Sequence, residues 1–284
     1  AVDRPGSGMA LVEAVAEAAR DGGFSGLHLQ WVEPGFALEQ ASSAGGSQNI
    51  GSGGWIAWRR QAYRWENRGY ADFTAYLADF SKNMRRNVGR ERAGLEAAGY
   101  RTRVVPAHEA GPEYWRLMAA YYERTNDKFG PWAARFLPSR FFELAPEYLG
   151  DSARFSAAFI PGRSEPVALA LLFEGSMRLW GRYWGAESDV PTLHFETCYY
   201  RPIEYAIERH IQSFDPGMGG HHKARRGFHA VMATSLHRVF EPRLSSLFTR
   251  AVAEASEAEA AFADQLNEEL PFRQDDRTTV PRPD

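Results

Sequence analysis

A histidine, a carboxylate and two phenols fall within seven residues of the chain, in the segment His194-Phe-Glu-Thr-Cys-Tyr-Tyr200. If a helix begins near Phe195, His194 lies at its cap and Glu196 in its first turn, with Tyr199 and Tyr200 about one turn further on. A carboxylate near an imidazole suits general acid–base catalysis, because one group can take a proton near neutral pH while the other orients it. These four side chains are therefore candidate catalytic groups. The alternative is that they are polar groups satisfied inside the core.

A basic segment, His221-His-Lys-Ala-Arg-Arg-Gly227, follows directly on the glycine-rich stretch Pro216-Gly-Met-Gly-Gly220. Flexible backbone beside cations is a plausible receptor for phosphate or carboxylate, because exposed amides and Lys or Arg donors act together there. We expect Lys223 to take part in catalysis, and His222 and Arg226 to bind substrate. The alternative is a plain basic turn.

Residues 82–103 carry seven basic residues against two acidic ones. Lys82, Arg85 and Arg86 crowd the first turn of an expected helix, against the preference of the helix dipole for acidic residues at that end. An anionic ligand would relieve this repulsion, so these three residues are candidate substrate-binding groups. The alternative is a solvated helix face.

A metal site is not expected. His194 and Cys198 are four residues apart and His221 and His222 could complete a tetrahedral zinc site, but the chain lacks a Cys-x-x-Cys or His-x-x-x-His pair. A cysteine nucleophile is not supported either, because Cys198 would lie inside the helix rather than at its N-terminus, where a thiolate is stabilised.

Length and composition describe an ordinary globular protein of one large domain or two modest ones, with 284 residues, 44% hydrophobic residues and a formal net charge of -3. No global basic field marks the chain as a nucleic-acid binder, so any charge argument has to be local. The single cysteine cannot form an intramolecular disulfide, which favours a reducing compartment. The sequence contains no run of about 20 apolar residues and no signal-peptide pattern, so we expect a cytoplasmic protein without a transmembrane segment.

The elements that must position these groups alternate between helix and strand periodicity, which predicts a mixed α/β (α+β) fold. Helices are expected at 9–21, 31–40, 72–80, 82–98, 111–127, 138–148, 195–211 and 243–269. Strands are expected at 26–31, 55–58, 62–65, 100–105, 154–160, 166–173, 177–184, 212–214 and 228–234. A Ser/Gly/Ala-rich loop is expected at 41–54, and a disordered tail at 270–284, where proline and charge dominate.

Six blocks of sequence, in order along the chain, resemble the FemAB-like family of predicted bacterial N-acyltransferases, which are associated with peptidoglycan biosynthesis and belong to the GNAT superfamily. The blocks are Tyr63–Tyr70, Ser81–Arg92, Gly181–Gly185, Leu193–Tyr200, Ile203–Glu208 and Gly219–Phe228. The resemblance extends from about Gly23 to Phe272. It implies a tandem GNAT-like fold, with residues 1–70 as the remainder of a first, incomplete domain and 71–269 as a second domain that includes the C-terminal helix. The chain opens on alanine and soon enters a helical pattern, which also suggests that the natural protein begins further upstream.

More distantly, the basic helix before Gly99 and the loop leading to Lys223 are similar to the Fem peptidyltransferases, which add amino acids from aminoacyl-tRNA to a cell-wall precursor. The chain has Gly220 and His221 where the FemAB-like loop usually has Gln and Glu, so a loop carboxylate is missing.

The resemblance implies an N-acyltransferase in which an amine attacks an activated acyl group. No tightly bound cofactor is expected; acyl-CoA or aminoacyl-tRNA would be the co-substrate, and a small-molecule or lipid-linked amine the acceptor. Glu196 and His194 would accept the proton, Tyr199 or Tyr200 would return one, and Lys223 would stabilise negative charge. Arg182, Tyr183 and Trp184 would line the groove. The alternative function is a non-catalytic binding protein that retains a GNAT-like groove.

Overall fold

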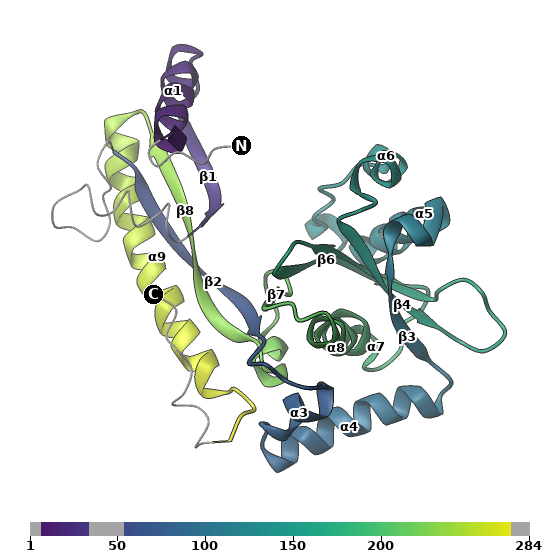
Figure 1. The fold of residues 1–284 in the computed structure, drawn as a ribbon. Coiled ribbons are helices and arrows are strands. Elements are labelled where there is room, and N and C mark those ends of the chain that lie inside the picture. The colour runs from purple at the N-terminus through teal and green to yellow at the C-terminus, as the bar shows by residue number, and fades with distance from the viewer. Residues whose placement is uncertain (1–6, 34–53, 274–284) are drawn as a thin grey trace. The chain divides into compact units, whose positions relative to one another are not determined.

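The computed structural model describes residues 7–33 and 54–273, which form the mixed α/β fold that the sequence predicts (Figure 1). The chain divides into two compact units. The first is built from the described residues up to Ala62 together with Ala230–Glu268, and the second from Tyr63–His229 together with the described residues from Glu269 onward. The expected division at residue 70 into two GNAT-like domains stays a prediction.

The described part of the first unit has the strand order β1-β8-β2, with β1 antiparallel to β8. Its elements are α1 (Ser7–Asp21), β1 (Gly26–Val32), the start of β2 (Ile56–Glu66), most of β8 (His229–Val239) and α9 (Pro242–Glu268). Ala16 of α1, Trp55 and Leu236 of β8 are buried together as its core.

The helix expected at 31–40 does not begin at Trp31. Trp31 and Val32 extend β1, and Val32 pairs with Thr234 of β8 across a shift in register. Trp31 itself takes a positive φ of 56°, so strand pairing overrides the local helical pattern here by means of a bulge. Residues 34–40, and 41–53 of the expected Ser/Gly/Ala loop, lie outside the described residues. The two short strands expected at 55–58 and 62–65 are one long strand, β2.

The second unit has the strand order β2-β7-β6-β5-β4-β3. Its strands are the end of β2, β3 (Arg101–Pro106), β4 (Ala153–Phe159), β5 (Ala168–Glu174), β6 (Arg178–Ala186) and β7 (Ser213–Asp215). Strands β4, β5 and β6 form the antiparallel meander that the sequence predicts, and β7 adds to β6 in parallel. A parallel neighbour requires a crossover, and the helical segment between β6 and β7 supplies it.

Helices cover both faces of this sheet (Figure 1). The helices of this unit are α3 (Phe73–Ala78), α4 (Lys82–Ala97), α5 (Ala107–Asp127), α6 (Ser139–Leu149), α7 (Leu193–Phe195) and α8 (Arg201–Glu208), with a π-helical turn at Glu196–Tyr200 and 3₁₀ turns at Gly130–Trp132 and His221–Arg226. Alternate residues of β4 separate the two layers: Ala157 packs with the α5–α6 core, whereas Ala158 packs with Leu95 of α4 and Leu193 of α7. The helix that carries the candidate catalytic residues therefore lies against the same face as α4.

The chain remains packed for several residues after α9. Leu270 and Phe272 are buried, and Ser81 donates its backbone N–H to the carbonyl of Pro271. The disordered tail expected from residue 270 is therefore wrong for 270–273, where apolar side chains find a site beside α3; residues 274–284 lie outside the described residues. Within the described ranges, none of the helices combines the length and apolar character needed to cross a bilayer.

Candidate active site

An open groove of about 910 Å³ lies within the second unit, between α4 and the 3₁₀ turn at His221–Arg226. One wall is the face of α4 that carries Arg90, Glu91 and Gly94, and the opposite wall carries His222 and Arg225. The remaining lining residues are Met84, Asn87, Leu95, Ala98, Val190, Pro191, Thr192, His221, Arg226 and Glu269. The groove thus joins cationic and imidazole groups to an apolar floor.

Arg226 fixes the 3₁₀ turn to its surroundings. Its guanidinium donates to the phenolic oxygen of Tyr200 at 2.9 Å, to the backbone carbonyl of His222 at 3.0 Å and to the carboxylate of Glu91 at 3.1 Å. It also lies 3.3 Å from the ring centre of Phe195. Tyr200 in turn donates its hydroxyl to Glu91. Because these donors already have acceptors within the protein, Arg226 mainly stabilises the groove wall. It contributes positive potential to the groove but no free pair of N–H donors for a ligand.

His222 and Tyr199 form a polar pair at this wall, sharing a hydrogen bond of 2.9 Å between the Tyr199 hydroxyl and His222 Nε2. The His194 ring packs edge-on against both. Burial, helped by Arg226 and Lys223, lowers the pKa of His222 to about 4, and burial with the neighbouring His222 lowers the pKa of His194 to about 3. Burial raises the pKa of Tyr199. At neutral pH the cluster therefore consists of uncharged imidazoles and a protonated phenol.

A π-helical turn at Glu196–Tyr200 allows two consecutive residues, Tyr199 and Tyr200, both to contact the 3₁₀ turn at His221–Arg226. A π turn adds one residue to the helix, and such turns are frequent at functional sites. Here Tyr199 reaches His222 while the adjacent Tyr200 reaches Arg226 and Glu91. The sequence predicts a regular helix over 195–211, and nothing in its periodicity distinguishes the π turn.

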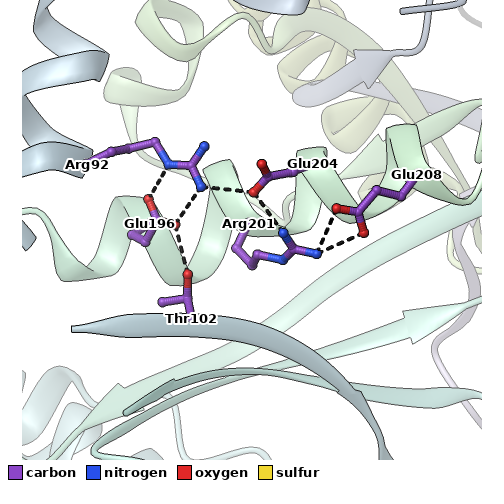
Figure 2. Close-up of polar contacts among 6 residues, drawn as sticks. All are labelled: Arg92, Thr102, Glu196, Arg201, Glu204 and Glu208. Carbon is purple, nitrogen blue, oxygen red and sulfur yellow. Dashed lines mark hydrogen bonds and ion pairs between the residues drawn. The ribbon is translucent and has the colours of Figure 1, made fainter. Parts of the chain in front are cut away.

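Glu196 makes its contacts with α4 and β3, through Arg92 and Thr102 (Figure 2). Arg92 of α4 donates to its two carboxylate oxygens at 3.0 and 3.1 Å, and the Thr102 hydroxyl donates at 2.9 Å. Arg92 also bridges to Glu204 at 2.9 Å, which Arg201 contacts in turn. Only 5% of Glu196 is exposed. Its carboxylate is therefore occupied in joining α4 to the π turn, and its expected role as proton acceptor is not supported by these contacts.

Lys223 is likewise occupied by the fold. Its ammonium group donates to the backbone carbonyls of Gly217, Met218 and Gly219, which use its three protons, and only 4% of the residue is exposed. Burial lowers the pKa of Lys223 to about 8. The lysine holds the glycine-rich loop in shape, which explains why a basic residue follows these glycines.

The other expected binding residues are dispersed. Trp184 packs against His194 with ring centres 5.0 Å apart, whereas Tyr183 packs against Tyr122 in the α5–α6 core and Arg182 is exposed beside Asp215. Lys82, Arg85 and Arg86 are exposed on the first two turns of α4, and none of them has an acidic partner among the described residues. Arg85 donates instead to the carbonyls of Ala78 and Phe80.

Three charged residues at the site are not among those that the sequence predicts for it. In the sequence, Glu91 and Arg92 are simply members of the basic helix expected at 82–98. Glu269, 3.5 Å from Arg225, is simply the last residue of the helix expected at 243–269. A carboxylate followed by an arginine on α4 is the one local signal, because both face the helix that carries Tyr200 and Glu196. Among the described residues, no group of three or more His, Cys, Asp or Glu side chains could hold a metal ion. Burial raises the pKa of the Cys198 thiol, which argues against a thiolate.

Comparisons with known proteins agree with the sequence resemblance. The family model FemAB-like, described as peptidoglycan biosynthesis/recognition, matches residues 1–274. A search of curated proteins gave no match.

Several solved structures share the fold. A conserved protein of unknown function from Bacteroides thetaiotaomicron is 11% identical with a TM-score of 0.54, over 82% of this chain and 75% of that one. L-PGS from Bacillus licheniformis is 12% identical with a TM-score of 0.53, over 85% of this chain and 77% of that one. FemX is also 12% identical with a TM-score of 0.53, over 84% and 78%. These structures, FemX among them, share the expected α/β fold with this chain, and the family match over nearly the whole sequence leads to one conclusion: the chain belongs to the FemAB-like family.

Proposed function

We propose that this protein is an N-acyltransferase that uses the groove of the second unit to bring an activated acyl or aminoacyl donor to an amine. The observation that carries the proposal is the hydrogen-bonded His222–Tyr199 pair, whose imidazole lines a groove with cationic side chains in a chain of the FemAB-like family. The groove offers a neutral proton acceptor beside positive charge, which is what acyl transfer to an amine needs.

The proposed proton path starts when the amine has attacked the acyl carbon. Bonding to the carbonyl carbon makes the amine nitrogen acidic, so a weakly basic imidazole such as His222 suffices as acceptor. In the tautomer that donates Nε2–H to Tyr199, His222 accepts the amine proton at Nδ1 and gives up its Nε2 proton to the Tyr199 oxygen, while the phenol passes its own proton to the leaving oxygen or sulfur. One proton thus moves from the amine to the leaving group, and both side chains end neutral, with His222 in its other tautomer. In this scheme Glu196 and Lys223 position the π turn and the glycine-rich loop, because their polar atoms are already bound.

The donor and acceptor classes follow from the family resemblance and the charge of the groove. Arg90 and Arg225, both exposed, offer charge to the phosphate of an acyl-CoA or of an aminoacyl-tRNA, with Lys82, Arg85 and Arg86 as a second anionic contact. A small or lipid-linked amine is the acceptor. A tRNA donor predicts steep loss of binding with salt, whereas a thioester donor predicts much less.

The test is a single-turnover transfer assay with acyl-CoA and aminoacyl-tRNA donors and a panel of amine acceptors. We expect His222→Gln and Tyr199→Phe each to lower the rate about a hundredfold while the melting temperature remains near that of the wild type. The matched control is His210→Gln, at an exposed position after α8, which leaves the rate unchanged. Transfer that survives both substitutions would show that the His222–Tyr199 pair is not the proton path.

A non-catalytic binding protein is the second candidate. It is favoured by the internal contacts that occupy Glu196 and Lys223 and by the weak basicity of His222. It predicts saturable binding of acyl-CoA or aminoacyl-tRNA without release of free thiol or deacylated tRNA over long incubation.

A further inference from the structure

Three large aromatic side chains project into solvent from one short segment between α5 and α6. Trp132 is 89% exposed, Phe136 76% and Phe129 59%, and we call residues 129–136 the aromatic turn. Gly130–Trp132 forms a 3₁₀ turn, in which side chains three residues apart lie on the same side, so Phe129 and Trp132 project together. Scattered single hydrophobic residues on a surface are normal, but a cluster of this kind marks an interaction site.

The aromatic turn is held in place rather than frayed. The buried Tyr122 hydroxyl accepts the backbone N–H of Leu137 at 3.1 Å and donates to the carbonyl of Ala134 at 3.2 Å. Arg135 is tied to α5 through Glu123 at 2.9 Å and Asp127 at 2.5 Å. Pro131 and Pro138 restrict the backbone further. These contacts hold the C-terminal part of the turn, and at its start the Phe129 N–H donates to the Asn126 carbonyl of α5 at 2.9 Å. The fold therefore holds the aromatic side chains in their exposed positions.

The composition of the segment indicates the chemistry of its partner. Residues 129–142, Phe-Gly-Pro-Trp-Ala-Ala-Arg-Phe-Leu-Pro-Ser-Arg-Phe-Phe, contain two arginines and no acidic residue. Arg140 is exposed and has no ion-pair partner among the described residues. Tryptophan and phenylalanine favour the boundary between lipid headgroups and acyl chains, and an unpaired arginine there contacts lipid phosphate. The exposed carboxylates of Glu123 and Asp127 beside the turn are paired with Arg135, so Arg140 is the arginine of the segment that remains available to lipid phosphate.

We propose that the aromatic turn is a membrane-docking surface, which inserts Phe129, Trp132 and Phe136 into the interface of an anionic lipid bilayer while Arg140 contacts headgroup phosphate. The docking is peripheral and reversible. It needs no acyl transfer, so its test is independent of the proposed function.

The experiment is co-sedimentation of the full chain with vesicles of phosphatidylcholine and phosphatidylglycerol in equal parts. We expect the wild type to bind, and the double variant Trp132→Ser/Phe136→Ser to bind at least tenfold more weakly with an unchanged melting temperature, since both side chains are exposed. The matched control is Phe24→Ser, which removes a similarly exposed aromatic side chain from the first unit and leaves binding unchanged. Arg140→Gln lowers binding to these vesicles but not to vesicles of phosphatidylcholine alone.

The proposal is overturned if the wild type does not sediment with vesicles, or if Phe24→Ser lowers vesicle binding as much as the double variant does. It is also overturned if the wild type sediments in buffer without vesicles, in a way that depends on protein concentration and disappears in the double variant. The last result would identify the aromatic turn as a contact between two copies of the chain.

Discussion

Arg92 balances the charge of a buried carboxylate, and its removal should be costly. In Arg92→Ala, Glu196 would keep only the Thr102 hydroxyl as a hydrogen-bond donor on its carboxylate. Leaving a buried charge without its partner costs about 3 kcal/mol, so we expect a drop of that size in the free energy of unfolding measured in urea. Arg92→Lys keeps the charge but loses the bidentate contact, so we expect its free energy of unfolding to lie between those of the wild type and Arg92→Ala.

The control for this prediction is Arg101→Ala. Arg101 faces Glu96 at 3.8 Å with both side chains largely exposed, so its loss should cost less than about 1 kcal/mol. Equal effects of the Arg92 and Arg101 substitutions would mean that the network in Figure 2 does not stabilise the second unit.

The chemistry of the candidate site was predictable from the sequence residue by residue, but the directions of its side chains were not. The sequence nominates His194, Tyr199, His222 and Arg226, and the fold brings them together although more than twenty residues separate the two segments. Glu196 sits among the same seven residues, yet it points to Arg92. Its direction depends on the π turn and on an arginine 104 positions away in the chain, and neither leaves a periodic signal.

At the scale of elements, α5 and β6 approach so closely that only glycine fits between them. A Cβ on Gly185 of β6 would meet the backbone carbonyl of Tyr121 of α5 at a distance that no real contact allows. Because this neighbour is backbone and cannot swing aside, Gly185→Ala should separate the helix from the sheet. We expect a loss of about 3 kcal/mol in the free energy of unfolding, at the upper end for overpacking.

Gly89 provides the matched comparison for Gly185. It lies at an exposed position inside α4, where an added Cβ meets nothing within 4 Å. Gly89→Ala should therefore raise the free energy of unfolding by about 0.5–1 kcal/mol, through helix propensity alone. If the two alanine variants behave alike, the close approach of α5 and β6 is not what selects glycine at 185.

Elements were predictable where local signals agree with the packing. Gly99, with a φ of 87°, follows the end of α4, which matches the helix expected at 82–98. Strands β4, β5 and β6 lie where strands are expected, and the pairs Pro161-Gly162 and Glu174-Gly175 favour the turns between them. Prediction failed where a partner distant in sequence decides. Trp31 joins a strand because β8 pairs with its neighbour, and Phe272 is buried because it pairs with Phe80, which lies between α3 and α4.

At the scale of the whole molecule, acid should act first on the second unit. Burial lowers the pKa of His194 to about 3 and those of His222 and His229 to about 4, and all three residues belong to this unit. In the unfolded chain these histidines take up protons near pH 6.5, but the folded unit excludes them until the pH is much lower. Between these values the unfolded state binds more protons, so its free energy falls relative to the folded state as the pH drops.

We therefore expect the free energy of unfolding of the second unit to be steady above pH 7 and to decrease from about pH 6.5 toward pH 4.5, with His194 alone contributing roughly 1.4 kcal/mol per pH unit. Urea titrations at a series of pH values measure this slope, and tryptic cleavage sites show which unit opens first. His194→Gln should flatten the slope whatever it does to stability at pH 7, because glutamine cannot take up the proton. Asn83→Gln, an exposed change without a titrating group, should leave the slope as it is. If the free energy of unfolding stayed level down to pH 4.5, these imidazoles would take up protons in the folded state. The histidine cluster of the proposed proton path would then be charged in acid while the protein remained folded.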